Sequence, residues 1–159
     1  IRDMEGLTEK IRAILRKANI IEPPVPIEKI AELFSIRVML YPSFPDNVSG
    51  TIVDQRGFVV IGVNSNHPKV RQRFTIAHEL GHFFAGDDLA AQIIDDVFDR
   101  PTDKEREANK FAAELLMPRD FLKQDVSRKM DIPQLAKRYN VSEQAISIRL
   151  LETGLINKL

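Results

Sequence analysis

Two histidines four residues apart, His78 and His82, lie in a segment whose apolar residues repeat at helical spacing. The repeat predicts a helix over residues 70–85. In a helix, side chains four positions apart are about 40° apart around the axis, so both imidazoles can reach one ion. Glu79 lies about 100° further round, where it can accept a proton from a water on that ion. The run His-Glu-Leu-Gly-His therefore predicts two metal ligands and a base on one helix.

The surroundings of this run favour a metal site over a chance pattern. Two histidines on a helix are often ordinary surface or core residues, and a five-residue pattern can arise by coincidence. Here the run holds two of the three histidines in the chain. It is also flanked by apolar residues that would bury the helix: Phe74, Ile76, Ala77, Phe83 and Phe84.

A third protein ligand has to be a carboxylate from another part of the chain. A catalytic zinc usually takes three protein ligands and leaves one position for water. The chain has no cysteine, and His67 stands before the helix beside Pro68, a poor position for reaching the ion. A second apolar stripe predicts an acidic helix over 103–116, and its carboxylates are Asp103, Glu105, Glu107 and Glu114. Glu105 and Glu107 flank the stripe on opposite sides, so periodicity leaves both open.

The remaining patterns predict an α+β fold. Helical spacing and proline breaks predict two helices before residue 35, and short helices after Pro118. Apolar runs at 36–41, 51–54 and 58–63 predict a small, mainly antiparallel sheet, with a hairpin turn at 55–57. The last two helices, 132–139 and 143–153, have Ser142 as an N-cap and Gly154 as a C-cap. Their spacing resembles a helix-turn-helix unit.

Composition limits the classes of function. The chain has 159 residues, with 23 basic and 23 acidic side chains. A formal charge of zero argues against a protein whose main work is binding the nucleic-acid backbone. Residues 119–159 carry 8 basic and 5 acidic residues, a slight excess of +3, and Arg149 is the one cation of the second helix of the unit. Charges throughout the first 17 residues and the absence of cysteine favour a cytoplasmic protein without a signal peptide or a membrane span.

Four segments resemble the ImmA/IrrE metallopeptidases. The most specific are Arg-Phe-Thr-Ile-Ala-His-Glu-Leu-Gly-His at 73–82 and Glu-Ala-Asn-Lys-Phe-Ala-Ala-Glu-Leu-Leu-Met-Pro at 107–118. The hairpin at 49–64 and the stretch 141–150 are similar too, so the resemblance covers roughly residues 25–155. It implies a zincin-like domain of the gluzincin type that binds Zn²⁺. It also implies that the third ligand is the glutamate before Ala-Asn, which is Glu107.

The resemblance also implies a function. It indicates an intracellular zinc-dependent endopeptidase that cleaves a helix-turn-helix repressor or an antitoxin-type protein, with Glu79 as the catalytic base. We expect a metallopeptidase domain over 1–118, with a helical segment over 119–159 packed on it. We also expect an extended substrate to add a strand to the edge of the sheet at 51–63. The alternative is a DNA-binding or sensor protein with a structural zinc, whose C-terminal segment carries the function.

Overall fold

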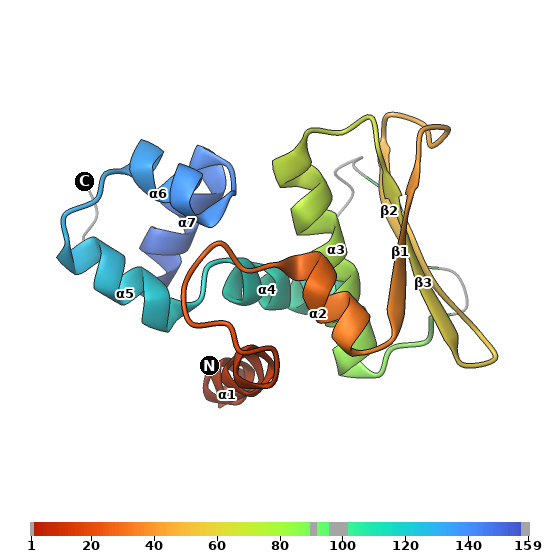
Figure 1. Cartoon of the computed structure of the whole chain (residues 1–159), viewed down its shortest axis with the longest axis horizontal. Helices are drawn as coiled ribbons and strands as arrows, with labels where there is room; N and C mark the ends of the chain where they lie inside the picture. The colour runs from red at the N-terminus through yellow and green to blue at the C-terminus, as the bar shows by residue number, and fades with distance from the viewer. Residues whose placement is uncertain (1, 90–91, 96–101, 157–159) are drawn as a thin grey trace. The chain divides into compact units, whose positions relative to one another are not determined.

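The computed structural model describes residues 2–89, 92–95 and 102–156 (Figure 1). The chain divides into two compact units. Residues 26–112 form one, called here the sheet unit, and residues 1–25 together with 113–159 form the other, the helical unit. The predicted boundary between residues 118 and 119 differs from this division. Because the first helix makes polar contacts with residues after 112, it belongs with the C-terminal helices.

The sheet unit contains a mixed sheet of four strands within the described residues. Its elements in chain order are α2 (Ile27–Leu33), β1 (Ile36–Tyr41), β2 (Val48–Gln55), β3 (Phe58–Asn64), α3 (Lys69–Ala85), β4 (Gln92–Asp95) and the beginning of α4 (Asp103–Leu116). The strand order is β1-β3-β2-β4. β2 runs antiparallel to β3 and β4, as predicted for the hairpin, whereas β1 runs parallel to β3.

The position of β1 corrects the expectation about substrate binding at the hairpin edge. β1 lies on the side of β3 away from β2, and β4 lies on the outer side of β2. Both hairpin strands, at 48–55 and 58–64, therefore have a neighbouring strand on each side. The hairpin turn predicted at 55–57 has two residues between the strands. Arg56 and Gly57 both have positive φ, 54° and 89°, as a type I′ turn requires.

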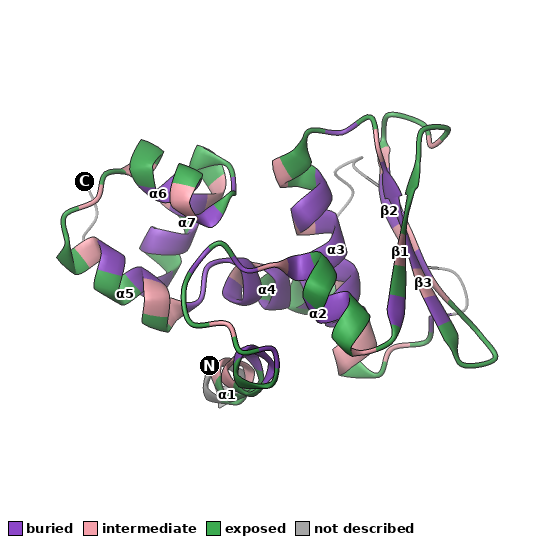
Figure 2. Ribbon diagram, in the orientation of Figure 1, coloured by how far each residue is buried: buried purple, intermediate pink, exposed green. Residues whose placement is uncertain are grey.

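The core of the sheet unit lies between the sheet and α3, as the burial colours of Figure 2 indicate. Period-two alternation in β2 and β3 places Ile52 and Ile61 inward, each with 0% exposure. Ile76 and Leu80 of α3 are equally buried, at 2% and 0%. The helix α3, which carries His78 and His82, is therefore buried along most of its length.

The helical unit contains α1 (Arg2–Lys17), α5 (Arg119–Ser127), α6 (Ile132–Tyr139), α7 (Glu143–Thr153) and the last turn of α4. The predicted caps of α7 are confirmed. The Ser142 hydroxyl accepts a hydrogen bond from the Ala145 N–H at 3.0 Å, and Gly154 ends the helix with φ 69°. Among the helices that the structure describes, none is long and apolar enough to cross a membrane.

A close approach between α3 and α4 depends on Gly81. A Cβ atom at residue 81 would lie 3.0 Å from the Ala108 Cα and 3.2 Å from the Phe111 Cβ. Ordinary van der Waals contact needs more room than this, so a larger residue would push α4 away. Small residues at 81 and 108 thus set the distance between the two helices.

We expect Gly81→Ala to lower the free energy of unfolding by about 1–3 kcal/mol, because the added methyl overpacks the α3–α4 contact. Denaturant unfolding of the full chain measures this. The control is Gly6→Ala on α1, where an added Cβ meets no atom within 4 Å. That change should leave stability unchanged or raise it by about 0.5–1 kcal/mol, because alanine favours the helix. Equal destabilisation by both changes would contradict the packing argument.

Candidate metal centre

Three side chains from two helices converge in the sheet unit. His78 and His82 project from α3, and Glu105 projects from the first turn of α4. Glu105 Oε2 lies 3.0 Å from His78 Nε2, and Oε1 lies 2.8 Å from His82 Nε2. The two Nε2 atoms are 3.2 Å apart. The potential ligand atoms of the three residues thus all lie within 4.8 Å of one another.

The opposite ring nitrogen of each histidine has its own oxygen partner. His82 Nδ1 lies 2.8 Å from Asp87 Oδ2, and His78 Nδ1 lies 2.7 Å from Asn109 Oδ1. A carboxylate oxygen only accepts, so His82 donates from Nδ1. The Asn109 atom that faces His78 is also an oxygen, so His78 likewise carries its proton on Nδ1. Both rings therefore present an Nε2 lone pair toward the carboxylate of Glu105 when they are neutral.

This arrangement fits a cation. Two Nε2 lone pairs and two carboxylate oxygens within hydrogen-bond distance repel one another unless positive charge lies between them. A metal ion supplies that charge, and the hydrogen bonds at Nδ1 are those that ligating histidines almost always make. Protonated histidines also supply positive charge between these atoms. The pKa of Glu105 is lowered, first by its hydrogen bond with His78 and then by the charges of both histidines, while burial opposes the shift.

The carboxylate of the cluster is Glu105, whereas the resemblance had implied Glu107 as the third ligand. The Glu107 side chain is 56% exposed, and its Oε1 lies 3.8 Å from Lys110 Nζ. The two glutamates are about 200° apart around the axis of α4. Glu105 shares its face with Ala108 and Asn109, which lie toward α3, so Glu107 faces away. The spacing of the sequence had left both glutamates open, and the resemblance implied Glu107.

Three further carboxylates do not join the cluster. Asp103 is 92% exposed and pairs with Arg106. Glu114 is buried in the helical unit, where it pairs with Arg149. Asp87 contacts Nδ1 of His82, on the side of the ring opposite the cluster. None of these three residues takes the place of a fourth ligand in the described structure.

Glu79 is buried next to the cluster without a hydrogen-bond partner. Its side chain has 0% exposure, and neither carboxylate oxygen has a partner within the described residues. Burial, and to a lesser extent the nearby charge of Glu105, raises the pKa of Glu79 to about 9. A buried carboxyl group with unsatisfied oxygens is unusual in a folded protein and is typical of a functional position. A cation at the cluster would favour the ionised form of Glu79.

The sequence did not identify Asp87 and Asn109 as the partners of the histidines. Asn109 follows Glu105 by four residues, so the two lie on the same face of α4. The sequence contains this four-residue spacing, and it indicates Asn109 only when Glu105 is taken as the ligand. Asp87 follows Gly86, which ends α3 in the left-handed conformation with φ 74°. The chain reverses there and brings Asp87 back to His82, a contact that no periodic pattern indicates.

Four further residues have side chains that could donate to a reacting oxygen, and each has other contacts. Tyr139 donates to Asp125 Oδ2 at 2.7 Å in the helical unit, and burial raises its pKa. His67 Nε2 lies 2.9 Å from the Asp46 carbonyl oxygen. The Tyr41 hydroxyl lies 3.6 Å from Met39 Sδ. Burial lowers the pKa of Arg73, and the negative charge of Glu28 opposes part of this shift. No donor is assigned among them.

Comparison with known proteins identifies the family. The chain matches the model of the IrrE N-terminal-like domain, peptidase M78, over residues 31–151. No curated protein matches the chain. A solved structure described as a Mycobacterium tuberculosis transcriptional regulator is similar, with a TM-score of 0.70 and 18% sequence identity. The match covers 92% of this chain and 46% of that one, and at this identity it shows a shared fold. The cluster of potential metal ligands on α3 and α4 agrees with the family match, which covers most of the chain. This chain belongs to the IrrE N-terminal-like domain family of peptidases.

Proposed function

We propose that this protein is a zinc-dependent endopeptidase. The observation that carries the proposal is the cluster of His78, His82 and Glu105, beside which Glu79 is buried without a partner. Three protein ligands with one open position are typical of catalytic zinc, whereas structural zinc usually has four. Membership of a peptidase family supports the same reaction class.

Each residue has a distinct part in the proposed reaction. His78, His82 and Glu105 would hold the ion, and Asn109 and Asp87 would fix the orientation of the two imidazoles. A bound zinc would supply Lewis acidity, which polarises a peptide carbonyl and makes water more acidic. Glu79 accepts the proton of the attacking water and passes it to the leaving amine. Its burial keeps bulk water from competing for that proton.

For the substrate, we propose a helix-turn-helix repressor or an antitoxin-type protein. The support comes from the family, because the residues of the site specify a peptide bond and no particular protein. The rival function, DNA reading by the C-terminal helices, is weakened by the place of Arg149. Its side chain is 8% exposed, pairs with Glu114 and donates from Nε to the Met117 carbonyl oxygen at 3.0 Å. The expected base-contacting cation therefore holds the helical unit together.

We expect Glu79→Gln to abolish cleavage while leaving zinc bound. The amide keeps the shape of the side chain but cannot accept the proton, and loss of a general base typically costs about 10²- to 10⁴-fold in rate. The measurement pairs zinc content with cleavage of a purified helix-turn-helix repressor offered as the substrate. The parent should cleave and the variant should not, with equal zinc in both. Turnover by the variant at the parental rate would rule out this role for Glu79.

We expect Asp87→Asn to weaken zinc binding by about 10- to 100-fold, because Asp87 orients His82 and raises the basicity of its Nε2. Competition with a chromophoric chelator measures the affinity. The control is Asp88→Asn at the neighbouring exposed residue, which should bind zinc as the parent does. An unchanged affinity in Asp87→Asn would show that the hydrogen bond at Nδ1 does not support the site.

A further inference from the structure

The first turn of α4 carries the carboxylate of the candidate metal centre. Glu105 is close to the start of this helix, which begins at Asp103. Backbone N–H groups in the first turn of a helix have no carbonyl partner inside the helix, so the turn frays unless another group accepts their hydrogen bonds. His78 and His82 follow the first two turns of α3, where the N–H groups have partners inside the helix. Of the three candidate ligands, Glu105 therefore depends most on a local cap.

Thr102 caps this turn with its hydroxyl and its carbonyl. Thr102 Oγ1 accepts a hydrogen bond from the Glu105 N–H at 3.2 Å. The Thr102 carbonyl oxygen accepts one from the Arg106 N–H at 3.0 Å. Both bonds are those of an N-cap residue. A further contact in the same turn, the ion pair of Asp103 with Arg106, is exposed and contributes little.

Thr102 and Glu105 have the spacing of a capping box, but their side chains form only half of one. In a complete box the side chain at the third helical position also reaches back to the N–H of the N-cap residue. α6 has a complete box, in which Asp131 Oδ1 accepts the Gln134 N–H at 2.8 Å and Gln134 Oε1 accepts the Asp131 N–H at 2.9 Å. In α4 the Glu105 carboxylate lies instead at the two histidines, 3.0 and 2.8 Å from their Nε2 atoms. The backbone of Glu105 thus belongs to the cap, and its side chain belongs to the candidate metal centre.

We infer that Thr102 is a positioning residue, whose hydroxyl holds the first turn of α4 so that the Glu105 carboxylate faces His78 and His82. This inference rests on the proposed function, in which those three residues hold zinc. Loss of the hydroxyl removes the acceptor of the Glu105 N–H, so that the turn has to be ordered when the ion binds. The cost of that ordering lowers the affinity for zinc.

The zinc affinity of the full chain, measured by competition with a chromophoric chelator, tests this role. Thr102→Ala should bind zinc about 3- to 10-fold more weakly than the parent, because alanine at an N-cap position destabilises the first turn. Thr102→Ser keeps a capping hydroxyl and should bind zinc as the parent does. Thr102 is exposed, so neither change disturbs the core. Circular dichroism checks that each variant is folded.

The matched control is Ser142→Ala at the start of α7, a helix that carries no ligand of the candidate centre. The Ser142 hydroxyl accepts the Ala145 N–H at 3.0 Å, which is the same type of cap. Denaturant unfolding should show a lower stability for both alanine variants. Zinc affinity, in contrast, should fall in Thr102→Ala and stay parental in Ser142→Ala.

The outcomes separate this inference from the proposed function. Parental affinity in Thr102→Ala, beside a loss in Glu105→Gln, would overturn the role of Thr102 and leave the metal centre in place. A loss in Thr102→Ser or in Ser142→Ala as large as that in Thr102→Ala would show that the hydroxyl cap does not position Glu105. Parental affinity in Glu105→Gln would overturn the metal centre itself, and the role of Thr102 with it.

Discussion

Glu105→Gln is expected to lose zinc binding, while the same change two residues later, Glu107→Gln, should leave it intact. The carboxylate of Glu105 lies within 3.0 Å of both Nε2 atoms and supplies the negative charge of the ligand set. Glutamine keeps the size of the side chain but removes that charge. The loss should exceed the roughly 10- to 100-fold typical of an outer partner such as Asp87.

The pair of variants is matched closely. Both residues lie near the start of α4, so each change removes one acidic group from about the same part of the helix. The two side chains point to different sides of α4, since Glu107 is exposed and faces Lys110. Zinc affinity and peptidase activity should both fall in Glu105→Gln and stay near the parental values in Glu107→Gln. The reverse result would restore the ligand that the resemblance implied.

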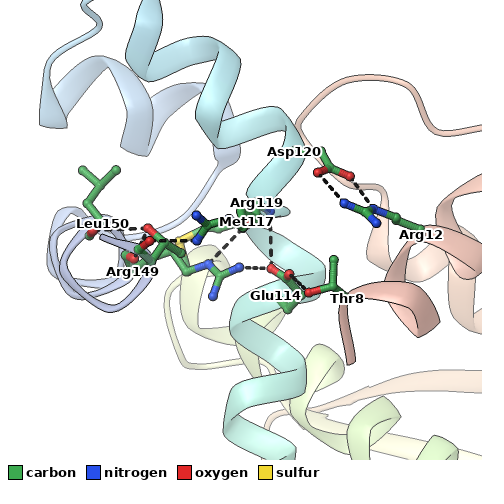
Figure 3. A network of polar contacts seen from close by, with 9 residues as sticks. Thr8, Arg12, Glu114, Met117, Arg119, Asp120, Arg149 and Leu150 are labelled. Atoms are coloured by element: carbon green, nitrogen blue, oxygen red, sulfur yellow. Dashed lines mark hydrogen bonds and ion pairs between the residues drawn. The ribbon is translucent and has the colours of Figure 1, made fainter. Parts of the chain in front are cut away.

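Glu114→Gln is expected to destabilise the helical unit strongly. Figure 3 shows Glu114 at the centre of a network of polar contacts, and its side chain is buried. It pairs with Arg149 and accepts hydrogen bonds from the Thr8 hydroxyl at 3.2 Å and the Arg119 N–H at 3.3 Å. Removal of one partner of a buried ion pair leaves the other charge uncompensated, which costs about 3–5 kcal/mol. Thermal and denaturant unfolding of the full chain measure the loss.

An exposed ion pair in the same unit provides the control for this prediction. Arg12 donates to both oxygens of Asp120, at 2.8 and 3.0 Å, and their side chains are 43% and 52% exposed. Asp120→Asn makes the same carboxylate-to-amide change there. It should alter stability little, because water screens the pair. Similar losses in both variants would show that burial does not set the strength of the Glu114 contact.

Replacing both members of the buried pair separates its charge from its packing. The variant Glu114→Leu with Arg149→Met removes both charges and keeps much of the buried volume. We expect it to be more stable than Glu114→Gln alone, since no uncompensated charge remains. Such a recovery would show that the charge of Arg149 stabilises the helical unit by compensating Glu114.

Local sequence determined the elements that carry the site. Apolar residues at helical spacing place His78 and His82 on one face of α3, and this follows from helix geometry alone. Ser142 and Gly154 marked the ends of α7 because caps satisfy backbone groups near them in the chain. The hairpin at 48–64 also follows from neighbouring residues, through alternation and a turn that needs positive φ.

Contacts between distant residues were decided by the tertiary structure. Glu105 and Glu107 flank the same apolar stripe, and only the packing of Gly81 against Ala108 shows which one faces the histidines. The position of β1 on β3 and the placement of α1 with the C-terminal helices are likewise contacts across the chain. The His-Glu-Leu-Gly-His run therefore placed two candidate ligands and a candidate base within five residues. The third candidate ligand lies on a second helix at a set distance, which the local pattern of either helix does not contain.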